Sequence, residues 1–211
     1  MSDYKGKDLQ QVDWYGKDLF QTDLSGADLR GATLAEADLS HACLVGADLR
    51  GADLSGADLY HADLTGANLR EATLRETQLF HCKLDKADFT EACLIKANMN
   101  TSSARQSCFD KADFYETTMF SADLTEASMK GADFFHADLF HANLHKTDLT
   151  GSDLTDAYLS NADLSEAVLD AVDLSGATMP DGTICAAGSI GECIVKTADD
   201  MGFPPIKMPG F

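Results

Sequence analysis

Residues 26–60 read GADLR-GATLA-EADLS-HACLV-GADLR-GADLS-GADLY, which is one five-residue unit repeated without a gap. In each unit a small residue, mostly Ala, is followed by a short polar residue, a Leu and two more residues. The spacing continues in both directions. From Leu9 to Met179, 35 consecutive positions five residues apart hold Leu, Phe, Met or Trp, with Ala104 as the exception. Such an internal period decides the architecture before any other signal.

A period of five matches neither the 3.6-residue turn of a helix nor the two-residue alternation of a strand. The chain must therefore turn a corner in every unit. Four units make a square coil of 20 residues, in which the central Leu and the small residue two before it point inward. Stacked coils can pair their backbones about 4.8 Å apart, as strands do. The sequence predicts a solenoid stabilised by contacts between neighbouring coils.

The unit A-[D/N]-L-x-x resembles the pentapeptide-repeat family, over about 170 of the 211 residues. The resemblance implies an all-β fold, a right-handed quadrilateral β-helix of about nine coils with a short non-repeat C-terminal cap. We divide the chain into an N-terminal cap with an atypical first coil (1–22), the β-helix (23–179) and a C-terminal cap or tail (180–211). A fold of this kind does not by itself supply a function.

The two ends depart from the repeat. Lys7 and Lys17 occupy inward slots, where burial of a charge is costly, so we expect a frayed first coil with Trp14 covering the apolar end. After Met179 the period stops, and Pro180-Asp181-Gly182 indicates a turn. The remaining segment is either a cap alone or a cap that is also a homodimer contact, because quinolone-resistance members of the family dimerise through their C-terminal ends. The candidate end contacts are Ile190, Ile194, Val195 and Phe203.

The segment Met1–Lys5 lacks the apolar core of a signal peptide, and no run of about 18 apolar residues predicts a membrane span. We therefore expect a cytoplasmic protein with free thiols. Cys185 and Cys193 lie eight residues apart, and a disulfide or a metal clip between them is the alternative. Cys82 takes the place of an inward Ala and is expected to pack in the core.

The middle of the repeat changes its core residues. Phe replaces Leu at centres 89, 109, 114 and 134, close to the small centre Ala104. The larger and smaller side chains can compensate in volume, since packed cores tolerate substitutions that conserve total volume. The alternative is a local kink or thinning of the rod.

The charge is strongly acidic, with 35 Asp and Glu against 16 Lys and Arg, a net charge of −19. This argues against general binding to nucleic acid or anionic membranes, which are polyanions. With 20 residues per coil, the face whose centres run Trp14, Leu34 to Leu174 (the Trp14 face) carries a net −8, and each of the other three about −3. Turn chemistry and solubility account for much of this charge. The candidate acidic interaction face comprises Asp53, Asp113, Glu116, Asp133, Asp153, Asp156 and Asp173.

The face whose centres run Leu19, Leu39 and onward (the Leu19 face) places His and aromatic residues outward, where the core does not need them. An apolar patch rimmed by polar groups is a candidate contact surface, and the alternative is ordinary stacking of like side chains between coils. The His ladder could make association sensitive to pH near 6, but it has no Cys or carboxylate to complete a metal site. The candidate aromatic/His face comprises His41, Tyr60, His61, Phe80, His81, Phe120, Phe140 and His141.

No sequence motif of an enzyme is present, and we expect no catalytic residue, cofactor site or metal site. Repeated Asp residues lie in equivalent environments, whereas an acid–base pair needs unequal ones. Two functions stay open. One is a protein-binding scaffold that docks through the aromatic/His face or the C-terminal end. The other, which the resemblance implies, is an acidic DNA mimic that binds DNA gyrase or topoisomerase IV and modulates quinolone sensitivity. Its roughly one net charge per 2.5 Å compares with one per about 1.7 Å in duplex DNA.

Overall fold

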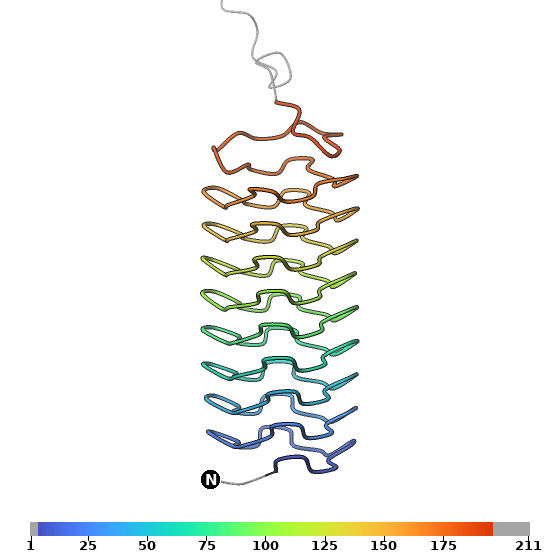
Figure 1. The fold of residues 1–211 in the computed structure, drawn as a ribbon, viewed down its shortest axis with the longest axis vertical. Coiled ribbons are helices and arrows are strands. Elements are labelled where there is room, and N and C mark those ends of the chain that lie inside the picture. The colour runs from blue at the N-terminus through green and yellow to red at the C-terminus, as the bar shows by residue number, and fades with distance from the viewer. Residues whose placement is uncertain (1–3, 196–211) are drawn as a thin grey trace, which may run out of the picture.

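The protein folds as a single stack of coils that rises along one axis, as the computed structural model shows (Figure 1). The structure describes residues 4–195. Within that range there is no helix, and thus none that could cross a membrane, and no strand longer than a single bridging residue. The five-residue unit explains the short pairing, because each side of a coil is straight for only about three residues before the next corner.

The coils are joined by parallel bridges between residues 20 apart, and the sequence-based expectation of this spacing is confirmed. One chain of bridges links Asp28, Asp48 and Asn68, which places Arg30, Arg50 and Arg70 in one column. Four such ladders run along the rod, one behind each of the Trp14 and Leu19 faces and one behind each of two others. We name these the Leu29 face (centres Leu9, Leu29 and onward) and the Leu24 face (centres Leu24, Leu44 and onward).

Each corner is a four-residue turn closed by a backbone hydrogen bond. At the first full corner of the Leu24 face, the N–H of Ala27 donates to the carbonyl of Leu24 at 3.0 Å, and Gly26 between them has φ +64°. The equivalent residue has positive φ at every corner from residue 6 to residue 176, and most of these residues are not glycine. A left-handed residue other than Gly costs about 1–2 kcal/mol. Ladder hydrogen bonds, such as His41 N–H to Tyr60 O at 2.8 Å, offset that cost.

The core is a column of Leu and Ala side chains along the axis. Leu24, Ala27 and Leu29 are fully buried, as the repeat predicts. In the middle of the rod the Phe89 and Phe109 rings stack at 4.8 Å, and Phe114 and Phe134 stack at 4.7 Å. Ala104 is also fully buried in this region. A small centre beside stacked rings agrees with compensation in volume.

The N-terminal end is closed by aromatic residues. Trp14 is 8% exposed and contacts the Tyr4 ring at 4.9 Å. Lys17 does not enter the core, because its ammonium lies 4.3 Å from the centre of the Trp14 ring, a cation–π contact. Lys7 is exposed. The bridge between Asp8 and Asp28 shows that the coil spacing already holds inside segment 1–22.

At the C-terminal end the chain reverses direction over the last coil. Antiparallel bridges join Thr178 to Ile184 and Asp173 to Ile190, so the segment after Met179 covers two of the four sides. A further hairpin brings the Cys185 and Cys193 Cα atoms to 5.0 Å, and the two residues form a disulfide. The expectation of two free thiols there is therefore wrong. The sequence lacked the information because this pairing depends on a hairpin outside the repeat.

Candidate interaction surfaces

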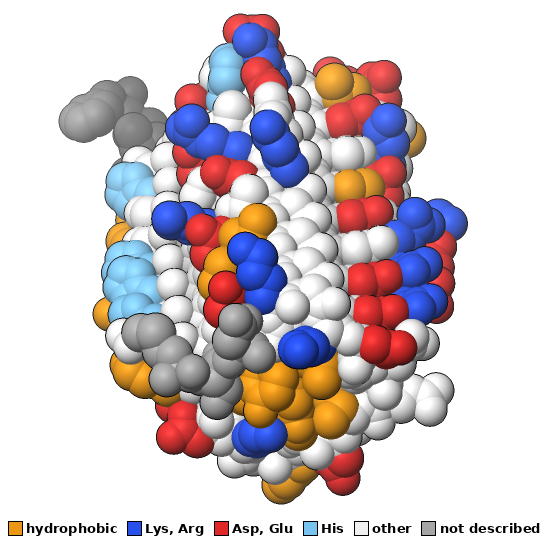
Figure 2. All heavy atoms as spheres, turned by 60° about the horizontal axis from the view of Figure 1, so that its bottom comes forward, with side chains coloured by type: hydrophobic (Ala, Val, Ile, Leu, Met, Phe, Trp, Pro, Cys, Tyr) orange, Lys and Arg blue, Asp and Glu red, His pale blue; other side chains and the backbone are white. Residues whose placement is uncertain are grey.

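The Leu19 face carries an ordered column of imidazole rings. His41 stacks on His61 at 5.2 Å with an interplanar angle of 21°, and His61 stacks on His81 at 5.0 Å with 14°. All three occupy the left-handed corner position, which His adopts more readily than most residues. His141 occupies the same position higher on the rod. The predicted His ladder is thus a physical column, visible in pale blue along one edge of the molecule (Figure 2).

A second column of phenyl and phenol rings lies beside the histidines. Tyr60 stacks on Phe80 at 5.8 Å, and Phe120 stacks on Phe140 at 5.8 Å. Phe20 is 48% and Phe120 41% exposed, so the column is a surface feature with apolar area in contact with solvent. The sequence-predicted aromatic and His residues therefore do lie together on one face.

The stacked histidines perturb one another. The pKa of His61 is lowered, chiefly because neighbouring rings displace water from it and also because His81 and His41 would repel its positive charge. Neutral rings stack without that repulsion. Within residues 4–195 no three His, Cys, Asp or Glu side chains gather as a metal site would require.

The acidic residues of the Trp14 face form a continuous chain, since bridges link Asp113, Asp133, Asp153 and Asp173. One oxygen of each carboxylate accepts the backbone N–H two residues further on, as Asp153 does from Thr155 at 2.8 Å. These residues therefore hold the corners. Each still presents its second carboxylate oxygen, and none of the four takes part in an ion pair that the structure describes.

The other predicted acidic residues differ in their surroundings. Asp53 accepts hydrogen bonds from the N–H and the hydroxyl of Ser55. Glu116 has a lowered pKa, first because Tyr115 donates a hydrogen bond to it and also because Lys96 lies 3.5 Å away. Asp156 is an exposed corner residue.

An aromatic cluster on the same Trp14 face was missed by the sequence reasoning. Tyr115 stacks on Phe135 at 5.9 Å, and Phe135 contacts His136 at 4.1 Å. The signal was available, because Tyr115 and Phe135 are 20 residues apart at equivalent unit positions. A patch of rings therefore lies between Glu116 and Asp156, beside the unbroken Asp column of the same face.

The Arg column of the Leu29 face is neutralised within itself. Arg30 makes two hydrogen bonds to Asp28, with its terminal nitrogen 2.6 Å from the carboxylate, and Arg50 does the same with Asp48. These bonds lower the pKa of both carboxyls. Figure 2 shows the resulting adjacent columns of acidic and basic side chains. Such a paired array offers little net charge to a partner.

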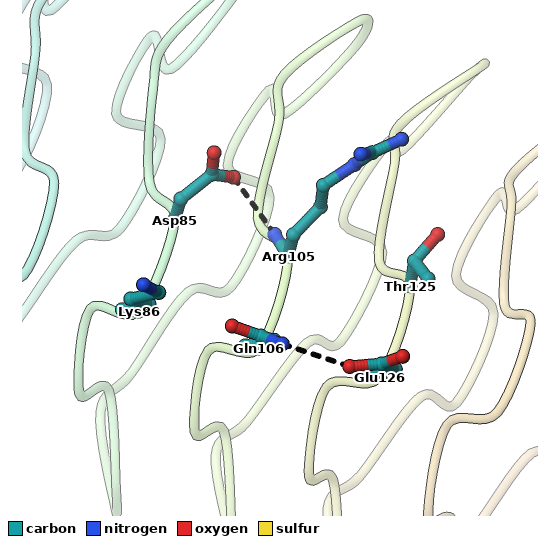
Figure 3. Close-up of a pocket in the computed structure, with 6 residues that line it drawn as sticks. All are labelled: Asp85, Lys86, Arg105, Gln106, Thr125 and Glu126. Atoms are coloured by element: carbon teal, nitrogen blue, oxygen red, sulfur yellow. Dashed lines mark hydrogen bonds between the residues drawn. The ribbon is translucent and has the colours of Figure 1, made fainter.

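A shallow groove of about 270 Å³ crosses the Leu24 face between Asp85, Arg105 and Thr125 (Figure 3). Asp85 accepts the backbone N–H of Arg105 at 2.9 Å, and Gln106 donates to Glu126 at 2.8 Å. Asp85 and Arg105, and likewise Gln106 and Glu126, are thus engaged with one another.

The C-terminal end exposes apolar residues. Ile190 and Ile194 are each 52% exposed and Val195 is 58% exposed, next to a hollow of about 440 Å³ bordered by Met179 and Cys193. Phe203, the fourth predicted end contact, lies outside the described residues.

The comparisons with known proteins agree with this geometry. The family model described as pentapeptide repeats matches in eight copies, over residues 18–51, 47–85, 82–119, 119–156 and 152–181. The chain belongs to the pentapeptide-repeat family, and its fold is the right-handed β-helix solenoid of that family. Members of the family act in general as repeat scaffolds rather than enzymes.

Three solved structures illustrate the similarity. HetL, a pentapeptide-repeat protein involved in heterocyst differentiation regulation in the cyanobacterium Nostoc, is 32% identical over 86% of this chain and 92% of its own, with a TM-score of 0.52. QnrB1, a plasmid-mediated fluoroquinolone resistance protein, is 18% identical over 85% and 91%, with a TM-score of 0.37. A thylakoid-lumen protein of Arabidopsis thaliana is 33% identical over 52% and 66%, with a TM-score of 0.33. No curated protein sequence matches the chain.

Proposed function

We propose that the protein is a non-enzymatic scaffold that binds another protein through the aromatic/His face. The observation that carries the proposal is the outward column of rings on the Leu19 face, including Phe20 and Phe120 with 48% and 41% of their surface exposed. The core does not need these rings, and aromatic side chains dominate the energy of protein interfaces. The C-terminal end, with Ile190 and Ile194 exposed, is the alternative contact for a partner or for a second copy of the chain.

Partner capture with matched variants tests the proposal. The purified protein is crosslinked in extract of its source cells, and the captured proteins are identified by mass spectrometry. Tyr60→Ser with Phe120→Ser should remove a partner that the wild type retains. Tyr15→Ser with Val45→Ser removes exposed apolar groups from two other faces and should leave capture unchanged. Docking through the Leu19 face would be contradicted if both pairs of substitutions reduce partner capture equally, or if neither pair reduces it.

The proposed location is the cytoplasm, as the sequence indicates, and it is open to a direct check. Cytoplasmic thiols are kept reduced, whereas disulfides persist in oxidising compartments. In the cytoplasm the Cys185–Cys193 disulfide of the structure would be reduced, so alkylation of thiols in intact cells followed by mass spectrometry should find both residues modified. Their recovery as a disulfide would place the protein in an oxidising compartment instead.

A second candidate function is binding to a type II topoisomerase as a DNA mimic. The observation that favours it is the chain of Asp113, Asp133, Asp153 and Asp173, which presents carboxylates at regular spacing without an ion-pair partner in the described structure. A DNA-binding surface is basic and would attract such an array. The attraction would weaken steeply as salt is added.

A gyrase supercoiling assay separates the two candidates. Because the four Asp residues also hold corners, the sharper variant is Glu116→Lys with Asp156→Lys, two corner residues of the Trp14 face. Glu71→Lys with Glu126→Lys changes the same charge at the same unit position on other faces. Topoisomerase binding predicts that the wild type changes gyrase activity and that only the first pair abolishes the effect. A wild type without effect on gyrase would exclude this candidate.

A further inference from the structure

The ring column of the Leu19 face is interrupted three times. The residues that follow the centres along this face occupy equivalent positions, 20 residues apart. In chain order they are Phe20, Ser40, Tyr60, Phe80, Asn100, Phe120, Phe140 and Ser160. A ring is therefore absent from this position at Ser40, Asn100 and Ser160.

Two of the three interruptions are filled by a neighbouring ring. Beside Ser40, His41 lies edge-on to both Phe20 and Tyr60, with ring centroids 5.6 Å away in each case. Beside Ser160, the ring of Tyr158 stacks on Phe140 at 5.7 Å with an interplanar angle of 19°. At these two points a ring from another unit position, His41 or Tyr158, continues the column.

The interruption at Asn100 is not filled. The corner residue there is Thr101 instead of His, and its hydroxyl is hydrogen-bonded to Nδ1 of His81 at 2.7 Å. The Asn100 side-chain oxygen accepts the backbone N–H of Phe120 at 2.7 Å, so the amide lies against the coil above. Among the described residues, no ring contact joins Phe80 and Phe120. Two coil spacings separate these rings, about 9.6 Å, which leaves room for one flat group stacked on both.

A groove on the same face shares the Phe80 ring with this slot. It has a volume of about 280 Å³, with the rings of Tyr60 and Phe80 on one side and Asp58, Gln78 and Asn98 on the other. The Asn98 amide donates to Gln78 at 3.1 Å, which leaves the Asp58 carboxylate as the charged group of the groove. A chain segment that lies in the groove can thus reach the slot at the next coil.

The charge of this face selects the kind of flat group. Between residues 37 and 161 the Leu19 face carries Asp38, Asp58 and Asp138 and no Lys or Arg. On the flanking faces, Lys83 is paired with Asp63 at 3.6 Å and Lys96 with Glu116 at 3.5 Å. The units that build the slot, residues 77–81, 97–101 and 117–121, carry no Asp, Glu, Lys or Arg, and the Asp58 carboxylate of the adjacent groove lies one coil below them on this face. The slot is therefore flat and aromatic, beside a carboxylate and on a molecule with a net charge of −19. A guanidinium is planar, always charged and stacks on aromatic faces, whereas an ammonium is not flat.

We propose that the slot between Phe80 and Phe120 binds an arginine side chain of the partner protein, with the guanidinium stacked between the two rings. This inference rests on the proposed function, since the same face docks the partner. The partner segment it specifies is basic and extended, with an exposed arginine that completes the column of rings.

Binding of short peptides tests the slot without the partner. The probe is the blocked tripeptide Ac-Gly-Arg-Gly-NH₂, compared with the same peptide carrying Lys or Tyr in place of Arg. NMR shifts of the Phe80 and Phe120 rings report occupancy. The arginine peptide should bind with a Kd in the millimolar range, about 4 kcal/mol, and at least about fivefold more tightly than either comparison peptide.

The matched variant fills the slot with a side chain of the protein itself. Asn100→Phe places a ring where Phe80 and Phe120 already have one at equivalent positions, and arginine binding should be lost. The substitution also removes the oxygen that accepts the Phe120 N–H, so a moderate loss of stability is expected with it. Val45→Phe adds a ring at the same unit position of the Leu24 face and should leave binding unchanged. If Asn100→Phe fails to fold, Phe120→Leu removes one wall and should weaken binding at least about threefold.

The outcomes separate this inference from the function on which it rests. Equal binding of the arginine and lysine peptides, tighter binding of the tyrosine peptide, or retained binding in Asn100→Phe would overturn the arginine slot. The arginine slot would also be overturned if Asn100→Phe captures the partner as well as the wild type does, but the scaffold function would then stand. Peptide binding at the slot without any partner lost in the Tyr60 and Phe120 variants would instead contradict the scaffold function alone.

Discussion

The smallest structural device in the molecule is the carboxylate that holds a corner. The residue before each centre is mostly Asp or Asn, and its side-chain oxygen accepts the N–H two residues later, as Asp163 does from Ser165 at 2.9 Å. Ser103 cannot reach its corner in this way. There Asp85, from the coil below, accepts the Arg105 N–H at 2.9 Å (Figure 3). It also accepts the Ser103 hydroxyl at 2.6 Å. A side chain from the coil below also supplies the acceptor at two other corners. Asp110 accepts from the Lys130 N–H and the Ser128 hydroxyl, and Asn100 accepts from the Phe120 N–H.

Replacing this acceptor tests the exchange. Asp85→Ala should lower the free energy of unfolding by about 1–3 kcal/mol, because it leaves the Arg105 N–H and the Ser103 hydroxyl without their charged acceptor. Asp85→Asn keeps a side-chain oxygen and should recover at least half of the loss. Urea unfolding followed by circular dichroism measures both. A loss for Asp85→Ala no larger than that for Asp85→Asn would show that Asp85 does not hold the corner.

The histidine column makes a prediction with a defined sign. The pKa of His61 is lowered in the folded protein, so the unfolded chain binds the proton more readily. Stability from this group is fully present above the unfolded pKa of about 6.5 and is lost as pH falls toward the lower folded value. His61→Asn, which tolerates the left-handed corner, should flatten the dependence of Tm on pH between about 5 and 6.5. His145→Asn, on the Leu24 face, is the control. An unchanged dependence in His61→Asn would refute the effect.

How far the sequence predicts single residues depends on whether their partners share the repeat. Asp before a centre, Cys82 in an inward slot and the columns of His41, His61 and His81 all followed from counting by 5 and by 20. The acceptor role of Asp85 did not, because it arises where the repeat lacks its usual Asp and a different coil supplies the oxygen. Because a buried Lys17 would be costly, the sequence predicted a frayed first coil; instead the coil spacing holds from Asp8, and the long Lys17 side chain lets its ammonium lie on Trp14.

At the scale of one coil, the central residues share a single layer of core. Ala104 lies in the layer that also contains the Phe109 and Phe114 rings, which contact each other at 5.3 Å. Large rings beside a small centre keep the volume of the layer close to that of ordinary Leu coils. The loss of stability on enlarging Ala104 should therefore depend on the residue at position 109.

A double-mutant cycle measures this dependence. Ala104→Leu alone should destabilise by about 1–3 kcal/mol through overpacking. Phe109→Leu alone should also destabilise, since it leaves a cavity. The double variant should lose about 0.5–3 kcal/mol less than the sum of the two. Additive losses, measured by urea unfolding, would mean that the two centres do not share one volume.

The C-terminal cap shows where the pattern of elements stops being predictable. Every coil follows from its neighbours, so bridges from Asp8 to Thr178 obey one rule. The cap obeys none, because its antiparallel pairing depends on side chains that occur once. Its existence was predictable from the loss of the period after Met179, but its direction and the Cys185–Cys193 disulfide were not.

For the whole molecule, the two ends of the rod are unlike. At the first coil the backbone N–H and C=O groups of Asp8, Asp13 and Asp18 have no backbone partner among the described residues. Apolar side chains gather at this end, toward the viewer in Figure 2. At the other end the cap pairs with the last coil at Thr178 and Asp173. The Tyr4 and Trp14 rings cover the core at the first coil, but they leave the backbone edge of that coil unpaired among the described residues. An unpaired backbone edge is a template for pairing with another chain, and covering it prevents such pairing.

Removal of the cap should therefore cause the protein to self-associate. A chain ending at Met179 presents the upward-facing groups of Leu174 and Ala177, which the cap residues Ser189 and Cys185 otherwise engage. The first coil of another copy offers the complementary groups at the spacing that joins coils within the chain. Because such contact is head to tail, it does not close on itself and leads to filaments.

Sedimentation velocity should show concentration-dependent growth for residues 1–179, with circular dichroism reporting whether the rod still folds. The full chain at equal concentration is the control, and Leu9→Lys in the shortened chain should suppress growth by placing a charge at the open end. A folded 1–179 that sediments as a single small species would show that the cap serves stability alone.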